Sequence, residues 1–178
     1  RLPVDAVLPE LLAALDAHSS AVLIAPPGAG KTTRVPLELI GEPWMQPGNA
    51  SGKRSNRIIV LEPRRLAARA AAERMAQLLG EPLGETIGLR ARLQSKTGPG
   101  NRIEVVTEGV FTRMVMDDPS LEGIAAVIFD EFHERSLDAD QGLALALDAQ
   151  AGLRGDLRIL VMSATLDGAR VARLLGDA

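Results

Sequence analysis

Short apolar runs alternate along the chain with segments that favour helices. Residues 21–25 and 125–129 are apolar and partly β-branched, as is typical of strands buried on both faces of a sheet. Further strands are expected at 57–62, 86–89, 102–107 and 158–162. Helices are expected over residues 5–18, 31–40, 64–79, 108–117 and 137–149, with a short one after residue 165. This alternation predicts an α/β fold with an open, mostly parallel sheet and helices on both faces.

The connections and the length indicate one domain. Residues 41–56 are rich in Gly, Pro, Ser and Asn and are predicted to form a long flexible loop, whereas residues 98–101 form a turn. The 178 residues suffice for one ordinary domain with a sizeable core, and no internal repeat is present.

A phosphate-binding pattern follows the first strand, in residues 25–32 (APPGAGKT). Glycines allow successive N–H groups to form an anion nest at a helix start. Lys31 would reach the β- and γ-phosphates, and the Thr32 hydroxyl would ligate Mg²⁺. The strict pattern has Gly at the position of Ala25. A glycine-rich turn before a surface lysine is the alternative, but strand, turn and Lys-Thr together favour a nucleotide site, formed by Gly28, Ala29, Gly30, Lys31, Thr32 and Thr33.

A carboxylate pair follows a second buried strand. Asp130 and Glu131 come directly after residues 125–129, at the strand end where open α/β sheets collect their ligands. Asp130 is placed to hold Mg²⁺ with Glu131 beside it, and Glu131 would in addition polarise the attacking water. The alternative is an acidic cap on the next helix, which the phosphate loop upstream makes less favoured.

The composition excludes several classes of protein. No Cys is present and His numbers two, so disulfides, thiol catalysis and a structural zinc site are not expected. No segment is long enough to cross a bilayer and no signal-peptide pattern opens the chain, so we predict a cytoplasmic protein without a membrane partner.

Positive charge is concentrated in the middle of the chain. Residues 53–102 hold eleven Lys/Arg and four Asp/Glu, for a net charge of +7, whereas the remainder holds nine and nineteen, for −10. Such a basic segment is expected where a nucleic-acid backbone is bound, and a solvated helix face is the alternative. Aromatic residues are few, so phosphate contacts are favoured over base stacking.

Five segments then occur in the order of the motifs of superfamily 2 helicases, which the chain resembles over essentially its whole length. They are residues 25–32, 62–69 (EPRRLAAR), 107–109 (TEG), 130–135 (DEFHER) and 163–165 (SAT), similar to motifs I, Ia, Ib, II and III. The Pro-Arg-Arg and His-Glu-Arg-Ser sequences resemble the DEAH-box branch, above all the bacterial HrpB-type RNA helicases. Phe132 stands where the family's usual tetrapeptide has Ala, a change that HrpB-type proteins share. The resemblance implies a RecA-like P-loop NTPase domain that uses ATP and Mg²⁺.

The resemblance also implies roles for residues in contact with single-stranded nucleic acid, RNA rather than DNA. Arg64 and Arg65 would grip the strand backbone, and Arg92 would hook it. Thr107 and Gly109 would offer a hydroxyl and an N–H group to further phosphates.

Other roles implied by the resemblance concern the nucleotide. Arg74 would stack on the adenine ring, a task that suits a planar guanidinium group. His133, Ser163 and Thr165 would couple the ATP site to motif II. The alternatives are solvated surface charges for Arg74 and also for Arg92, and a helix cap for Ser163 and Thr165.

Family members carry a second RecA-like domain whose arginine fingers complete the ATP site, and its motifs do not occur in this sequence. We therefore expect the chain to be the first motor domain of an ATP-dependent RNA helicase. A self-contained P-loop ATPase or kinase acting on a small molecule is the alternative, and a non-catalytic RNA-binding module is a third.

Overall fold

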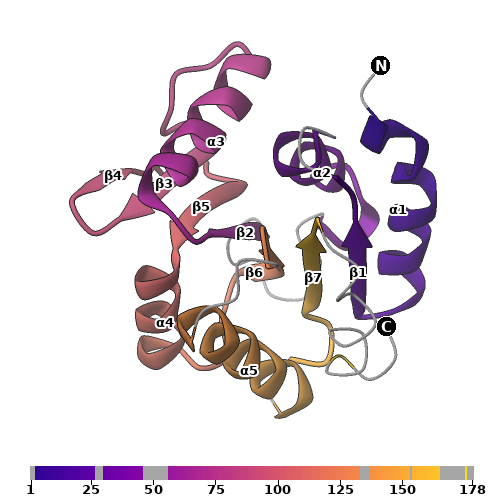
Figure 1. Cartoon of the computed structure of the whole chain (residues 1–178). Helices are drawn as coiled ribbons and strands as arrows, with labels where there is room; N and C mark the ends of the chain where they lie inside the picture. The colour runs from indigo at the N-terminus through magenta and orange to yellow at the C-terminus, as the bar shows by residue number, and fades with distance from the viewer. Residues whose placement is uncertain are drawn as a thin grey trace.

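A single seven-stranded sheet organises the part of the chain that the computed structural model describes, which is residues 3–26, 30–45, 56–132, 137–152, 154–164 and 175. The strand order is β1-β7-β6-β2-β5-β3-β4 (Figure 1). The strands are β1 (Ser20–Ile24), β2 (Arg57–Glu62), β3 (Ile87–Ala91), β4 (Gln94–Lys96), β5 (Ile103–Thr107), β6 (Ile124–Phe129) and β7 (Arg158–Ser163). Neighbouring strands run parallel except β4, which pairs antiparallel with β3.

Helices cover both faces of this sheet and create two cores. Helices α1 (Leu8–Ala17), α2 (Lys31–Leu39) and α3 (Arg65–Leu78) pack on one face, and α4 (Glu108–Asp117) and α5 (Leu137–Gly152) pack on the other (Figure 1). Strand β6 is buried throughout, and its side chains alternate between the cores: Ala126 and Ile128 in the first, Val127 and Phe129 in the second. The predicted α/β fold is confirmed.

The expected elements agree with the observed ones apart from small shifts and one strand. The strand expected at 86–89 is Ile87–Ala91, and Arg64 precedes α3 as its N-cap. Strand β4 is not predicted because its three residues are all exposed and polar, so they carry no hydrophobic pattern.

The predicted loop at 41–56 is partly structured. Pro43–Met45 form a short 3-10 helix, η2, in which Met45 is fully buried, and a second such helix, η1, spans Pro3–Ala6. Residues 46–55 lie outside the described residues, as does the helix expected after residue 165. No helix among those described is long and apolar enough to cross a membrane.

Parallel pairing brings the carboxyl ends of six strands to one edge of the sheet. There, Ile24 of β1 is level with Ser163 of β7, and Glu62 of β2 is level with Thr107 of β5. Ligands of open α/β sheets bind at this edge, so the predicted site residues fall where the topology favours a site.

Candidate nucleotide and nucleic-acid site

The phosphate loop leads directly into α2. Gly30 is the N-cap of this helix and has a φ of 89°, a left-handed conformation that favours glycine. Lys31 begins the helix and is 5% exposed, and its Nζ donates a hydrogen bond to the carbonyl oxygen of Ala25 at 3.2 Å. The ammonium group is thereby directed back into the loop. Gly28 and Ala29 lie outside the described residues.

Alanine fits at position 25, where the strict pattern has glycine. Ala25 is buried, and its N–H group donates to the Ser163 carbonyl oxygen at 3.0 Å. Among the described non-glycine residues, only Leu121 and Glu131 have positive φ, so the backbone at residue 25 does not need a glycine. The substitution therefore leaves the entry to the loop unstrained.

Two candidate metal ligands meet where the predicted phosphate loop lies next to the carboxylate pair. Thr32 Oγ1 donates to Asp130 Oδ2 at 2.7 Å, across 98 residues of sequence. Asp130 is 4% exposed, and its Oδ1 accepts a hydrogen bond from the Glu131 N–H group at 2.9 Å. Hydroxyl and carboxylate oxygens are ligands that Mg²⁺ prefers, so Thr32 and Asp130 fit that ion. The described residues contain no group of three or more His, Cys, Asp or Glu that could hold a metal.

Glu131 has an unusual backbone and a cationic partner. Its φ of 51° is left-handed, a conformation that costs free energy in a non-glycine residue and recurs at functional sites. Its Oε2 lies 3.3 Å from a terminal nitrogen of Arg64, and the two side chains are 30% and 63% exposed, respectively. The residue expected to polarise water thus contacts a residue expected to bind the strand.

Glu62 is a member of the site that the sequence analysis does not assign. It ends β2, is fully buried, and hydrogen-bonds to the Asp130 carboxylate, and its Oε1 has no partner among the described residues. Burial, this hydrogen bond and the negative charges of Asp130 and Glu131 raise the pKa of Glu62 to about 11, so its carboxyl group is neutral at pH 7. The sequence holds a signal that could have identified Glu62, because an acidic residue at the end of a buried strand needs a polar or charged partner.

Arg74 lines a cavity together with two residues of the predicted nucleotide set. The cavity holds about 630 Å³ and is lined by Asp5, Gly30, Thr33, Arg34, Leu37, Arg74, Leu78 and Leu79. Arg74 itself is exposed and donates to Gln77 Oε1 at 3.0 Å. The cavity places an apolar wall and a planar guanidinium group next to the start of α2, an arrangement that suits a nucleobase.

Two helix N-termini lie side by side at the ends of β2 and β5. Arg64 and Arg65 precede and begin α3, while Thr107 is the N-cap of α4 and Gly109 lies in its first turn. Both arginines are exposed, and a Cβ built at Gly109 would meet open space. Helix N-termini attract phosphate groups, so this pair of termini fits a strand backbone. Arg92 is also exposed and lies at the tip of the β3–β4 hairpin, next to exposed Leu93.

The end of β7 connects the two halves of the candidate nucleotide site. The carbonyl oxygen of buried Ser163 accepts from Ala25, and that of Met162 accepts from the Phe132 N–H group at 3.0 Å. The Phe132 ring is buried in edge contact with Phe129, at 6.3 Å between centroids. Phe132 therefore anchors the turn that follows Asp130. His133 and Thr165 lie outside the described residues.

Comparisons with known proteins show what this chain resembles in sequence and in fold. Residues 5–174 match the family model of the DEAD/DEAH box helicases. The chain is 55% identical over 177 residues to the ATP-dependent RNA helicase HrpB of Escherichia coli, covering 99% of this chain and 21% of that protein. It is 38% identical to the human ATP-dependent RNA helicase DHX30, covering 99% of this chain and 14% of that protein. The crystal structure of the E. coli DEAH/RHA helicase HrpB superposes with a TM-score of 0.91 over all of this chain and 22% of that one, which shows a RecA-like fold. The chain thus spans at most about a fifth of the length of these relatives.

Proposed function

We propose that this chain, which belongs to the DEAD/DEAH box helicase family, is the ATP-binding motor domain of an ATP-dependent RNA helicase. The hydrogen bond from Thr32 to Asp130 carries the proposal, because it joins the phosphate loop to the carboxylate pair in a form suited to Mg²⁺. The relatives named above, ATP-dependent RNA helicases, support both the nucleotide and the strand.

The nucleotide would be held mainly by the start of α2. The N–H groups of Gly28, Ala29 and Gly30 bind the phosphates, and Lys31 pairs with the β- and γ-phosphate charge. Thr32 and Asp130, with Glu131 beside them, would hold Mg²⁺, which when bound would neutralise charge on the phosphates.

Hydrolysis would depend on Glu131. Its carboxylate would orient the attacking water and accept a proton from it as the water oxygen bonds to the γ-phosphorus. The bond from the γ-phosphorus to the oxygen that bridges the β- and γ-phosphates breaks in the same step, and ADP leaves with that oxygen. His133, Ser163 and Thr165 are proposed to couple these events to the rest of the domain.

The base would occupy the cavity beside Arg74. Thr33 and Gly30 form the end of this cavity nearest the phosphates, while Leu78 and Leu79 offer apolar contact. The guanidinium plane of Arg74 stacks on the adenine ring.

The nucleic-acid strand would lie across the adjoining part of the same edge of the sheet. Arg64, Arg65 and Arg92 bind phosphates as cations, and Thr107 and Gly109 add a hydroxyl and a backbone N–H group. None of these contacts reads a base, so binding should be independent of sequence.

A second RecA-like domain is proposed as the partner that completes the ATP site, as the family resemblance implies. Arginine fingers are typically worth about 10³–10⁵ in rate. Residues 1–178 alone should therefore fold and bind nucleotide weakly, yet hydrolyse ATP very slowly even with RNA. A cytoplasmic location stays a prediction.

The test is ATP turnover by the full-length protein with no strand, with single-stranded RNA, and with DNA of the same sequence. RNA should stimulate turnover more than DNA does. Lys31→Ala should abolish nucleotide binding, whereas Glu131→Gln should bind ATP and fail to hydrolyse it. The matched control is Arg113→Ala, since Arg113 is 81% exposed on α4 and outside the site. Turnover indifferent to both strands, or transfer of phosphate to a small acceptor, would contradict the proposal.

A further inference from the structure

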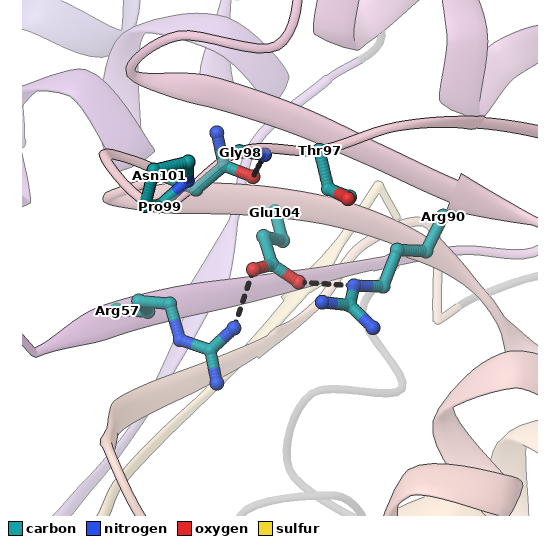
Figure 2. A pocket seen from close by; sticks show the side chains of 7 residues that line it. All are labelled: Arg57, Arg90, Thr97, Gly98, Pro99, Asn101 and Glu104. Atoms are coloured by element: carbon teal, nitrogen blue, oxygen red, sulfur yellow. Dashed lines mark hydrogen bonds and ion pairs between the residues drawn. The ribbon is translucent and has the colours of Figure 1, made fainter. Parts of the chain in front are cut away.

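A buried carboxylate joins three strands beneath the Arg92 hairpin. Glu104, the second residue of β5, is 1% exposed and forms ion pairs with Arg57 of β2 and Arg90 of β3. Figure 2 shows the Glu104 carboxylate between the two guanidinium groups, with one oxygen directed at each. The Oε2 atom lies 2.7 Å from Nε of Arg90. A charge this deeply buried needs a cationic partner to be stable.

Arg90 connects this ion-pair cluster to the hairpin. It lies two residues before Arg92, and the hairpin is held by only three residue pairs, of which Arg90 with Ser95 is the central one. The direction of the last residues of β3 therefore sets where the tip lies. Arg57, in contrast, begins β2 and has no part in the hairpin.

The two faces of the hairpin are held in different ways. On the α3 side, Arg69 donates to Gln94 Oε1 at 3.0 Å, between two exposed side chains. On the other side, Arg90 reaches Glu104 along a cavity of about 370 Å³ whose lining includes Thr97, Gly98 and Asn101 (Figure 2). Contacts between two exposed side chains contribute little. The contact on the other side is an ion pair without a hydrogen bond, and the Arg90 side chain is 42% exposed, but the Glu104 side chain is only 2% exposed and cannot exchange its cationic partners for water, so this ion pair is the firmer constraint.

We propose that Glu104 is a positioning residue for strand binding, which acts by holding Arg90 and so setting the direction in which the β3–β4 hairpin presents Arg92 to the phosphate backbone. This inference rests on the proposed function. Loss of the Glu104 charge leaves two guanidinium groups facing one another across the cavity, and their repulsion displaces the end of β3. The Glu104 carboxylate does not contact the nucleic acid. It contributes to the affinity for nucleic acid by fixing the position of Arg92.

The experiment is a double-mutant cycle on RNA affinity in the full-length protein. A fluorescent single-stranded RNA of fixed sequence is titrated at several salt concentrations. Arg92→Ala should weaken binding about tenfold and lower the salt slope by about 0.7. Glu104→Gln should weaken binding roughly three- to tenfold alone, but less than about twofold when Arg92→Ala is already present. Arg57→Gln removes the other partner of the same carboxylate and should change the affinity less than about twofold.

The outcomes separate the possibilities. Equal losses from Glu104→Gln in both backgrounds, or losses from Arg57→Gln as large as those from Glu104→Gln, would overturn the positioning role. Tighter binding by Glu104→Gln would also overturn it, because released Arg90 would then be the strand contact. If Glu104→Gln fails to fold, Arg90→Gln removes the same ion pair, leaves Glu104 with Arg57, and takes its place in the cycle. A wild-type protein that binds no RNA contradicts the proposed function itself, whereas intact RNA binding with an additive cycle contradicts only this inference.

Discussion

The contact between Arg64 and Glu131 predicts how Arg64→Gln changes ATP turnover and RNA binding in the full-length protein. One guanidinium group lies 3.3 Å from the proposed hydrolytic carboxylate and is also proposed to bind the strand backbone. These two uses compete, because a guanidinium group that turns to a phosphate leaves Glu131 free to accept a proton. Arg64→Gln should therefore raise ATP turnover without RNA, weaken RNA binding, and remove most of the stimulation by RNA.

The magnitude follows from the distance and the exposure. Coulomb's law gives roughly 5 kcal/mol for unit charges 3.3 Å apart at an effective dielectric constant of about 20. Because the Arg64 side chain is 63% exposed, water screens most of this attraction, and exposed pairs contribute about 0.2–1 kcal/mol. Since about 1.4 kcal/mol is tenfold in rate, RNA-free turnover should rise by a factor of about 1.4 to about 5.

The assay is steady-state ATP hydrolysis with RNA titrated from zero to saturation, so that kcat and KM are separated at each RNA concentration. Arg113→Gln serves as the control, because it removes an exposed arginine on α4 whose partner is Asp117. If RNA-free turnover of Arg64→Gln stays at the wild-type value or falls, Glu131 and the nucleic-acid backbone do not compete for the Arg64 guanidinium group. Unchanged stimulation at saturating RNA would refute it as well.

Three further predictions concern stability and binding. Phe132→Ala should cost about 3–5 kcal/mol in urea unfolding, because it empties a buried site against Phe129; a loss below about 1 kcal/mol would contradict that packing role. Because the pKa of Glu62 is raised from 4.5 to about 11, its contribution to stability is greatest below pH 4.5 and declines as pH rises toward 11. Glu62→Gln should flatten the decline of the free energy of unfolding with pH, measured in the presence of EDTA between about pH 5 and about pH 9, inside the titration window. An equally steep decline in the variant would show that Glu62 is not the cause. Arg65→Ala should lower the salt slope of RNA binding by about 0.7. An unchanged slope would show that Arg65 is a solvated surface charge that does not contact a phosphate.

Local pattern accounts for most of the elements and for the chemistry that is proposed for the nucleotide site. Apolar runs such as 125–129 predict strands because a buried strand needs apolar side chains on both faces, whatever its neighbours are. Lys31, Thr32 and Asp130 are recognisable because phosphate binding needs glycines and a cation at a fixed spacing, and Mg²⁺ needs oxygen ligands at a strand end. Strand β4 escapes this reasoning because it gains its hydrogen bonds from β3 without burying any side chain.

Contacts between distant residues depend on the order of the strands, which the pattern does not specify. The order places β6 beside β2, and this adjacency brings Arg64 to Glu131 and Glu62 to Asp130. Likewise, β5 lies between β2 and β3, so Glu104 can meet Arg57 and Arg90 from opposite sides. Residue types alone reveal which side chains can carry charge, whereas burial and neighbours decide which of those charges are paired, neutral or free to bind, because both depend on the folded distances between strands.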